Sequence, residues 1–530
     1  MAVQARPIRM VASFMTVGVW TLASRILGFV REILIAAFIG AGPVAEAFFV
    51  AFSLPNMFRR FFAEGAFNTA FVPMFAKKVE ADEAPLAFAR QAFAGLATLL
   101  LMLTLIAQVA MPWLVLAMAS GFVGDLRFDL ATLMGRIAFP YILLISLAAA
   151  LSGVLNSIGR FAAAAAAPVL LNVILIAALL AAEMGLGPEF PVPTGEDPTG
   201  LRHGTLLTLA VPLAGLAQLA LVWWAAARAG FPVRLSLPRL SPDLKRLAII
   251  AGPAMLAGGV VQINLLVGRQ VASFFDGAIV WLSFADRLYQ LPLGVIGIAL
   301  GVVLLPELSR RLRAGEGDAA QASLSRAAEL ALALTLPAAV ILVIVPLPVV
   351  SVLFERGAFT ADDTANTALA LAVYGLGLPA FVMQKVLQPV YFARADTVRP
   401  FRYALVAMVV NAVIAIGLGL TIGFIGAAIA TTLAGWVMLG LLARGRRNFG
   451  PETQFDMRFR KRLWGMIAAS VGLGAILWAV LLTLGPMFGL EGWRYLALGI
   501  LLGTGLGGYL LLAQIFGALR ISEHRGALRR

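Results

Sequence analysis

The stretch SRILGFVREILIAAFIGAGPVAEAFFVAFSLPNMFRRFFAEGAFNTAFVPMFAKK, residues 24–78, places arginines and glutamates inside two otherwise apolar segments. A charged side chain at bilayer depth is costly, so it has to face other protein groups or a water-filled cavity. The stretch therefore predicts a cationic cavity built around its charged residues, which are Arg25, Arg31, Arg59, Arg60, Glu32, Glu46 and Glu64.

The composition is that of a membrane protein. Of 530 residues, 61% are hydrophobic and 13% are charged, a balance outside the range of soluble globular domains. The net charge of +14 is spread over many short loops, with no basic tract that carries interleaved aromatics, so we expect no nucleic-acid partner. With no cysteine and two histidines, we expect neither a metal site nor a cofactor.

Apolar windows of spanning length predict an all-α, multi-pass fold with about 14 transmembrane helices. Of the 41 Lys and Arg residues, 29 fall on the termini and even-numbered loops, 5 on the opposite loops and 7 inside the spans. Because cytoplasmic loops are rich in Lys and Arg, this distribution predicts that both termini are cytoplasmic.

A weak internal repeat predicts two pseudo-symmetric six-helix lobes. The pair Pro73 and Lys77 recurs 233 residues later as Pro306 and Arg310. The pair Arg160 and Asn172 recurs 239 residues later as Arg399 and Asn411. Chance is an alternative explanation for each match. The predicted organisation is an N-terminal lobe at 1–235, a C-terminal lobe at 240–447 and two extra helices at 460–520. The substrate path is expected between the lobes.

On the first span, Arg25 and Glu32 are seven residues apart and share a helix face, whereas Arg31 lies about 120° round the helix from Arg25. One straight helix cannot aim both arginines at one point. Either the helix bends at Gly28 or the cavity wraps around it.

The other charged residues each have a structural alternative. Arg59 and Arg60 could extend to the cytoplasmic surface instead of a cavity. In the eighth span, Asp286 and Arg287 could form an ion pair with a purely structural role.

Several arginines around one chamber suit a diphosphate, because a guanidinium pairs bidentately with phosphate oxygens and stays charged. The neighbouring carboxylates Glu32, Glu46, Glu64 and Asp286 could pair with the arginines in the empty site and exchange partners when substrate enters. The alternative is that all of these groups form static ion pairs between helices.

The sequence resembles the MurJ (MviN) family of lipid II flippases, within the multidrug/oligosaccharidyl-lipid/polysaccharide transporter superfamily. The similarity is dense over residues 20–80 and returns at GPAML, at FADRLYQLPLGVIGIALGVVLLPELSR and at LFERGAFTADDT. In that family, arginines of the first, second and eighth helices line a central cationic cavity. The resemblance therefore implies substrate-binding roles for Arg25, Arg31, Arg59 and Arg287, and a groove for the undecaprenyl tail in the last two helices.

The function that this resemblance implies is transfer of lipid II, an undecaprenyl-diphosphate-linked disaccharide-peptide, across the bacterial inner membrane by alternating access. We expect a monomer that contacts membrane lipids and serves peptidoglycan biosynthesis and cell shape. The alternatives are a carrier of another lipid-linked oligosaccharide, a cation-coupled multidrug exporter and a membrane enzyme. An enzyme is not expected, since the adjacent acidic pair Asp362 and Asp363 is typical of a helix start and not of a metal motif.

Overall fold

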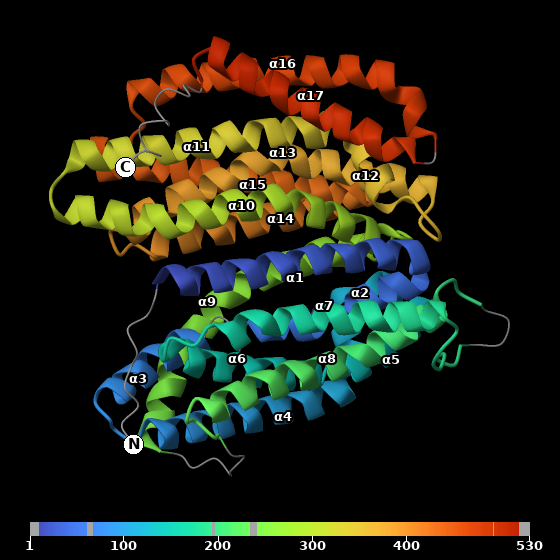
Figure 1. Cartoon of the computed structure of the whole chain (residues 1–530), viewed down its shortest axis with the longest axis vertical. Helices are drawn as coiled ribbons and strands as arrows, with labels where there is room; N and C mark the ends of the chain where they lie inside the picture. The colour runs from blue at the N-terminus through green and yellow to red at the C-terminus, as the bar shows by residue number, and fades with distance from the viewer. Residues whose placement is uncertain (1–9, 61–66, 193–196, 234–240, 491, 519–530) are drawn as a thin grey trace. The chain divides into compact units, whose positions relative to one another are not determined.

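The computed structural model describes residues 10–60, 67–192, 197–233, 241–490 and 492–518. The described residues form an all-α structure without strands, which confirms the predicted fold class (Figure 1). They divide into two compact units, one made of Met1–Val280 with Arg356–Phe359 and the other of Trp281–Glu355 with Thr360–Arg530.

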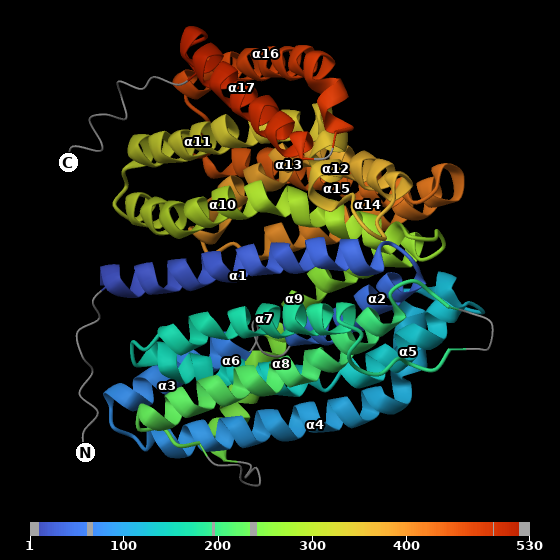
Figure 2. The same ribbon diagram turned by 45° about the vertical axis from the view of Figure 1, so that its right-hand side comes forward.

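In the first unit, α7 packs along α1 and α8, α2 packs against α5, and α6 packs against α8 (Figure 2). The helices of this unit are α1 (Met10–Ile39), α2 (Pro43–Arg59), α3 (Asn68–Glu80), α4 (Pro85–Met118), the short η2 (Ser120–Phe122), α5 (Leu126–Ala138), α6 (Tyr141–Ser157), α7 (Ala162–Glu183), α8 (Leu201–Arg228) and α9 (Pro242–Ala272).

The helix α9 belongs to this first unit, whereas the repeat argument assigned it to the second lobe. It packs on α3 and α4, where Lys78 Nζ lies 3.0 Å from Asp243 Oδ2 and the side chain of Leu244 approaches Gly95. The division thus falls at Val280, beyond α9, and the two six-helix lobes stay a prediction.

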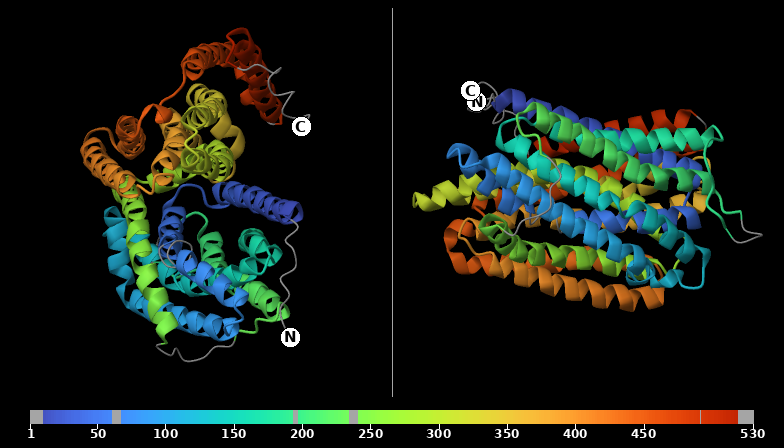
Figure 3. Two further views of the ribbon diagram at one scale, coloured as in Figure 1. Left: turned by 90° about the vertical axis from the view of Figure 1, so that its left-hand side faces the viewer. Right: turned by 90° about the horizontal axis from the view of Figure 1, so that it is seen from below.

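In the second unit, α13 packs on α11 and α15, α14 packs along α15, and α16 packs along α17 and α11; α16 and α17 are the orange-red and red helices in the left view of Figure 3. Its helices are α10 (Ala278–Arg313), which begins in the last residues of the first unit, α11 (Gly317–Ile344), α12 (Pro346–Phe354), α13 (Ala361–Phe392), α14 (Val398–Ile422), α15 (Ile425–Gly445), the short η3 (Arg446–Phe449) and η4 (Pro451–Thr453), α16 (Met457–Phe488) and α17 (Trp493–Ile515).

The acidic pair Asp362 and Asp363 starts α13, as its sequence context predicted. The backbone N–H of Asp363 donates to Thr360 Oγ1 at 3.2 Å, and the N–H of Thr360 donates to Asp363 Oδ2 at 2.9 Å. This reciprocal capping satisfies two backbone donors that the helix start would otherwise leave unpaired. The indole N–H of Trp281 donates to the other carboxylate oxygen of Asp363, so this carboxylate has a structural role.

The long helices expose large apolar side chains on their outer faces, among them Val413 and Leu420 on α14 and Trp464, Val471 and Leu482 on α16. Contiguous apolar surface of this kind is unfavourable in water and favourable in lipid. Within the described part of the chain, ten helices are long and apolar enough to cross a membrane. The count of fourteen spans stays a prediction.

The helices α14 and α15 approach each other closely at Gly426. A Cβ added there would lie 2.7 Å from both the backbone N of Gly419 and the backbone C of Leu418. Without a hydrophobic driving force between helices in lipid, small residues promote packing by allowing backbones to come together.

We predict that Gly426→Ala lowers the free energy of unfolding by about 1–3 kcal/mol, because the two backbones must separate to admit the methyl group. The matched control is Gly440→Ala on the same helix, where an added Cβ meets no atom within 4 Å. Thermal unfolding of the detergent-solubilised protein measures both variants. Equal melting temperatures for the two would contradict the close approach.

Candidate functional site

The first-span arginines lie on different sides of one continuous helix. Arg25 is exposed, whereas Arg31 is only 7% exposed and faces α7. The helix α1 runs from Met10 to Ile39 without interruption at Gly28. The 120° separation expected from the sequence is therefore present without a break in the helix.

Arg31 is held by two partners. Its Nη1 donates to Oδ1 of Asn172 on α7 at 2.9 Å, and its Nη2 donates to Glu32 Oε1 at 2.6 Å. Glu32 is 1% exposed, so both charges of this ion pair are withdrawn from solvent. The sequence predicted Glu32 as a partner for the arginines, and in the structure Glu32 pairs with Arg31, the residue before it. Asn172 was singled out only as part of the weak repeat.

Glu46, which the sequence assigned to the same arginine set, pairs instead with Arg127 at the start of α5. Arg127 Nη1 donates to Glu46 Oε2 at 2.9 Å, and the backbone N–H of Ile279 donates to Glu46 Oε1 at 3.2 Å. Arg127 also pairs with Asp125 at 2.6 Å and with Asp276 at 2.9 Å. This network, buried at Glu46 and Arg127, joins α2, α5 and the segment that leads into α10.

Arg59 ends α2 and is half-buried, and Arg60 follows it as an exposed residue. Exposure of Arg60 agrees with the alternative that it reaches the surface of the spans. Glu64 lies outside the described residues, so its predicted pairing is not described.

Asp286 and Arg287 lie on α10 in the second unit. Asp286 is half-buried and accepts a hydrogen bond from Nε2 of Gln290, one turn further along the helix, while Arg287 is exposed. The binding roles of Arg25, Arg31, Arg59 and Arg287 stay predictions, taken up below.

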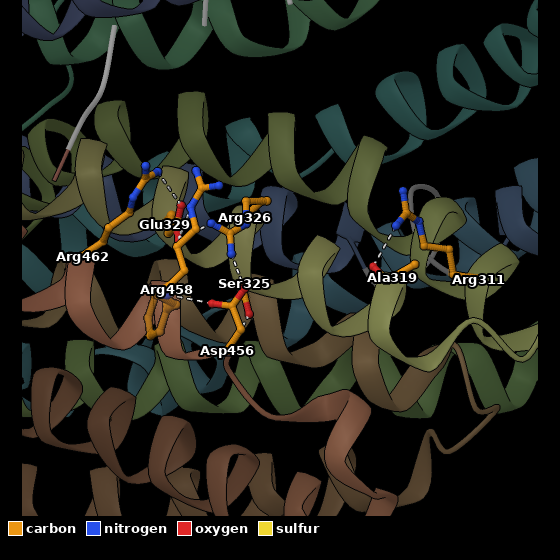
Figure 4. Close-up of polar contacts among 9 residues, drawn as sticks. Arg311, Ala319, Ser325, Arg326, Glu329, Asp456, Arg458 and Arg462 are labelled. Carbon is orange, nitrogen blue, oxygen red and sulfur yellow. Dashed lines mark hydrogen bonds and ion pairs between the residues drawn. The ribbon is translucent and has the colours of Figure 1, made fainter. Parts of the chain in front are cut away.

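A further ion-pair cluster lies between α11 and the start of α16 (Figure 4). Buried Glu329 accepts from Arg326 Nη1 at 2.6 Å and from Arg462 Nη1 at 3.1 Å, and Arg458 Nε lies 3.7 Å from it. Asp456 pairs with Arg326. The cluster thus links the first of the two C-terminal helices to α11.

Asp456 also orders the start of α16. Its carboxylate accepts from the backbone N–H of Phe459 at 2.7 Å, and its own N–H donates to Ser325 Oγ at 3.0 Å. An acidic N-cap satisfies a free backbone donor and interacts favourably with the helix dipole. Figure 4 also shows Arg311, at the end of α10, donating to the carbonyl oxygen of Ala319 on α11.

Asn172, Arg127 and Glu329 were not among the residues that the sequence assigned to the site. Glu329 carried a usable signal, because it is a lone acid within the apolar run of α11. Asn172 and Arg127 had no comparable signal, since their partners are 141 and 81 residues away along the chain.

The fold and the buried charges define a multi-pass membrane protein with the fold of known transporters. A solved inward-facing multidrug resistance MATE family transporter of the MOP superfamily is similar with a TM-score of 0.64 and 15% identity, over 80% of this chain and 94% of that one. A solved structure titled lipid II flippase MurJ, inward closed conformation, is similar with a TM-score of 0.78 and 24% identity, over 95% of this chain and 98% of that one.

The family follows from sequence comparison. The family model described as lipid II flippase MurJ matches residues 35–496. A probable lipid II flippase MurJ of Rhizobium tropici is 41% identical over 98% of this chain and 97% of its own length, and the lipid II flippase MurJ of Burkholderia cenocepacia is 35% identical over 87% and 89%. The chain belongs to the MurJ family, which confirms the resemblance found in the sequence.

We predict that Glu329→Ala lowers the free energy of unfolding by roughly 3 kcal/mol, because it leaves the partly buried Arg462 without its carboxylate. The measurement is the melting temperature in detergent. Glu307→Ala is the control, since Glu307 pairs with Arg310 and Arg311 on the surface of α10 and its loss should leave the melting temperature nearly unchanged. A similar shift in both variants would contradict the anchoring role.

Proposed function

We propose that this protein flips lipid II from the cytoplasmic to the outer leaflet of the bacterial inner membrane by alternating access. The observation that carries the proposal is membership of the MurJ family over nearly the whole chain, with relatives named as lipid II flippases. The lipid tail stays in the bilayer while the polar head crosses. The protein transports its substrate and does not alter it chemically.

The arginine set supports a diphosphate as the group that is recognised. Arg25, Arg31, Arg59 and Arg287 supply planar donors suited to phosphate oxygens, and Glu32 and Asp286 are at hand as alternative partners. The pairing of Arg31 with Glu32 fits the idea that a carboxylate neutralises an arginine until substrate arrives. The competing interpretation is a static ion pair, which would be needed for stability alone.

A multidrug exporter is the alternative that the fold alone would allow, because MATE transporters share it. At 15% identity, that similarity supports only the fold. A site for cationic drugs needs net negative charge, whereas the four residues assigned here to substrate binding are all arginines. The family comparison and the charge of the site therefore both favour the lipid carrier.

The two C-terminal helices are proposed to hold the undecaprenyl tail. The helices α16 and α17 pack closely where Gly505 and Gly508 approach side chains of α16, and their outer faces are apolar. An apolar groove open to lipid would accept a polyprenyl chain without removing it from the bilayer.

We predict that the variants Arg25→Ala, Arg31→Ala and Arg287→Ala each fail to support growth of a strain depleted of its own lipid II flippase, because each removes a phosphate partner. Loss of one charged hydrogen-bond partner corresponds to about ten- to hundredfold weaker binding. Growth is scored at matched levels of membrane-inserted protein.

The control for these variants is Arg136→Ala, since Arg136 is an exposed arginine that donates to the carbonyl oxygen of Gln108. It should support growth. Arg31→Lys separates charge from geometry, because lysine keeps the charge and loses the bidentate fork; partial growth is expected. Normal growth with Arg25→Ala and Arg31→Ala combined would rule out the diphosphate site.

The proposed orientation places both termini in the cytoplasm and the loop around Gly195 outside, as the 29 to 5 distribution of basic residues predicts. Reporters fused at Gly195 and after Arg530 should report opposite sides of the membrane. A reporter at Gly195 that is active only in the cytoplasm would overturn the orientation and the predicted number of spans.

A further inference from the structure

Asn172 uses both ends of its side-chain amide to join α7 to α1. Its Oδ1 accepts from Arg31 Nη1 at 2.9 Å, and its Nδ2 donates to the backbone carbonyl of Ser24 at 2.9 Å. The residue is 6% exposed. Since the acceptor faces a guanidinium and the donor faces a carbonyl, the orientation of the amide is determined by its partners.

Arg31 is withdrawn while these contacts hold. Its terminal nitrogens donate to Asn172 and Glu32, and 7% exposure leaves no room for a phosphate to approach the guanidinium. Bidentate recognition of a phosphate requires two parallel N–H groups that face the ligand. The side chain must therefore leave Asn172, or turn about it, before it can bind a diphosphate.

A neutral amide is suited to a contact that has to be released. A carboxylate at position 172 would form a charge-assisted bond to Arg31 and compete with the phosphate, whereas an amide forms a weaker bond. An amide also supplies the donor to the Ser24 carbonyl, which a carboxylate lacks. Asn172 can thus orient Arg31 without binding it as tightly as an acid would.

The space for this contact comes from Gly28. A Cβ added at Gly28 would lie 3.6 Å from Asn172 Nδ2, which is an ordinary van der Waals distance, so alanine fits there. A longer side chain at position 28 would extend into the volume of the Asn172 amide. The requirement for a small residue at Gly28 therefore has an explanation other than a helix bend.

We propose that Asn172 is a positioning residue that holds Arg31 away from the substrate, and that release of Arg31 from Asn172 is a step in binding the lipid diphosphate. Only the second part of this proposal, the binding step, rests on the proposed function. Its first part, that Asn172 controls the accessibility of Arg31, is independent of any substrate.

The first experiment measures that accessibility by labelling the full-length protein in membranes with phenylglyoxal, an arginine-selective dicarbonyl, and quantifying each arginine by mass spectrometry. Exposed Arg25 should react and Arg31 should be protected in the unaltered protein. Asn172→Ala should increase labelling of Arg31 several-fold, and Asn172→Asp should not.

Asn411→Ala is the matched control, because Asn411 is also a buried asparagine of a long helix, α14, and its loss should leave Arg31 protected. Gly28→Leu should also increase labelling of Arg31, since the leucine displaces the amide of Asn172 without replacing that residue. This variant tests the proposal if Asn172→Ala fails to insert into the membrane. Unchanged labelling of Arg31 in both Asn172→Ala and Gly28→Leu would overturn the proposal.

The second experiment measures binding of purified lipid II to the protein in nanodiscs. Asn172→Asp should weaken binding about tenfold when Arg31 is present and have no further effect in an Arg31→Gln background. A merely structural role would weaken binding equally in both backgrounds and lower the melting temperature, which would overturn the binding step.

The two experiments separate the two proposals. If the unaltered protein binds no lipid II, the proposed function fails and the binding step fails with it, while the labelling result still decides whether Asn172 controls Arg31.

Discussion

The burial of the Arg31 guanidinium within the apolar helix α1 is the constraint on which the surrounding structure depends. An unpaired charge at that depth would be strongly unfavourable, so the chain supplies a carboxylate from the next residue and an amide from α7. These contacts require α7 to lie against α1, and they place Asn172 beside Gly28. The contacts of Arg31 and Asn172 thus fix one point at which two helices of the first unit meet.

Ion pairs between helices also join other parts of the molecule. Arg127 with Glu46 and Glu329 with Arg462 join helices that are distant along the chain. Glu46 and Arg127 lie in the first turns of α2 and α5, and Glu46 also accepts from a backbone N–H, whereas Glu329 lies in the middle of α11. In lipid, apolar faces give little preference for one neighbour over another, so such polar contacts and close glycine approaches specify which helices pack together.

The sequence predicted the all-α membrane fold because apolar segments of spanning length are a strong signal. It also predicted the start of α13, since the acidic pair Asp362 and Asp363 is typical of a helix N-terminus. It did not predict the partners of Arg31 and Glu46, because Asn172 and Arg127 are far away in the chain and no local pattern connects them. The helix α1 is continuous through Gly28, and the glycine makes room for Asn172. The count of spans and the binding roles of the arginines remain predictions.

Exposure of lipid II in the outer leaflet is the direct readout of the proposed transfer of lipid II between leaflets. In cells depleted of their own flippase and expressing this protein, an externally added enzyme that cleaves lipid II should reach most of the pool. If the protein flips lipid II, cleavage returns to the level of undepleted cells. Lipid II that stays protected while the protein is present in the membrane would contradict it.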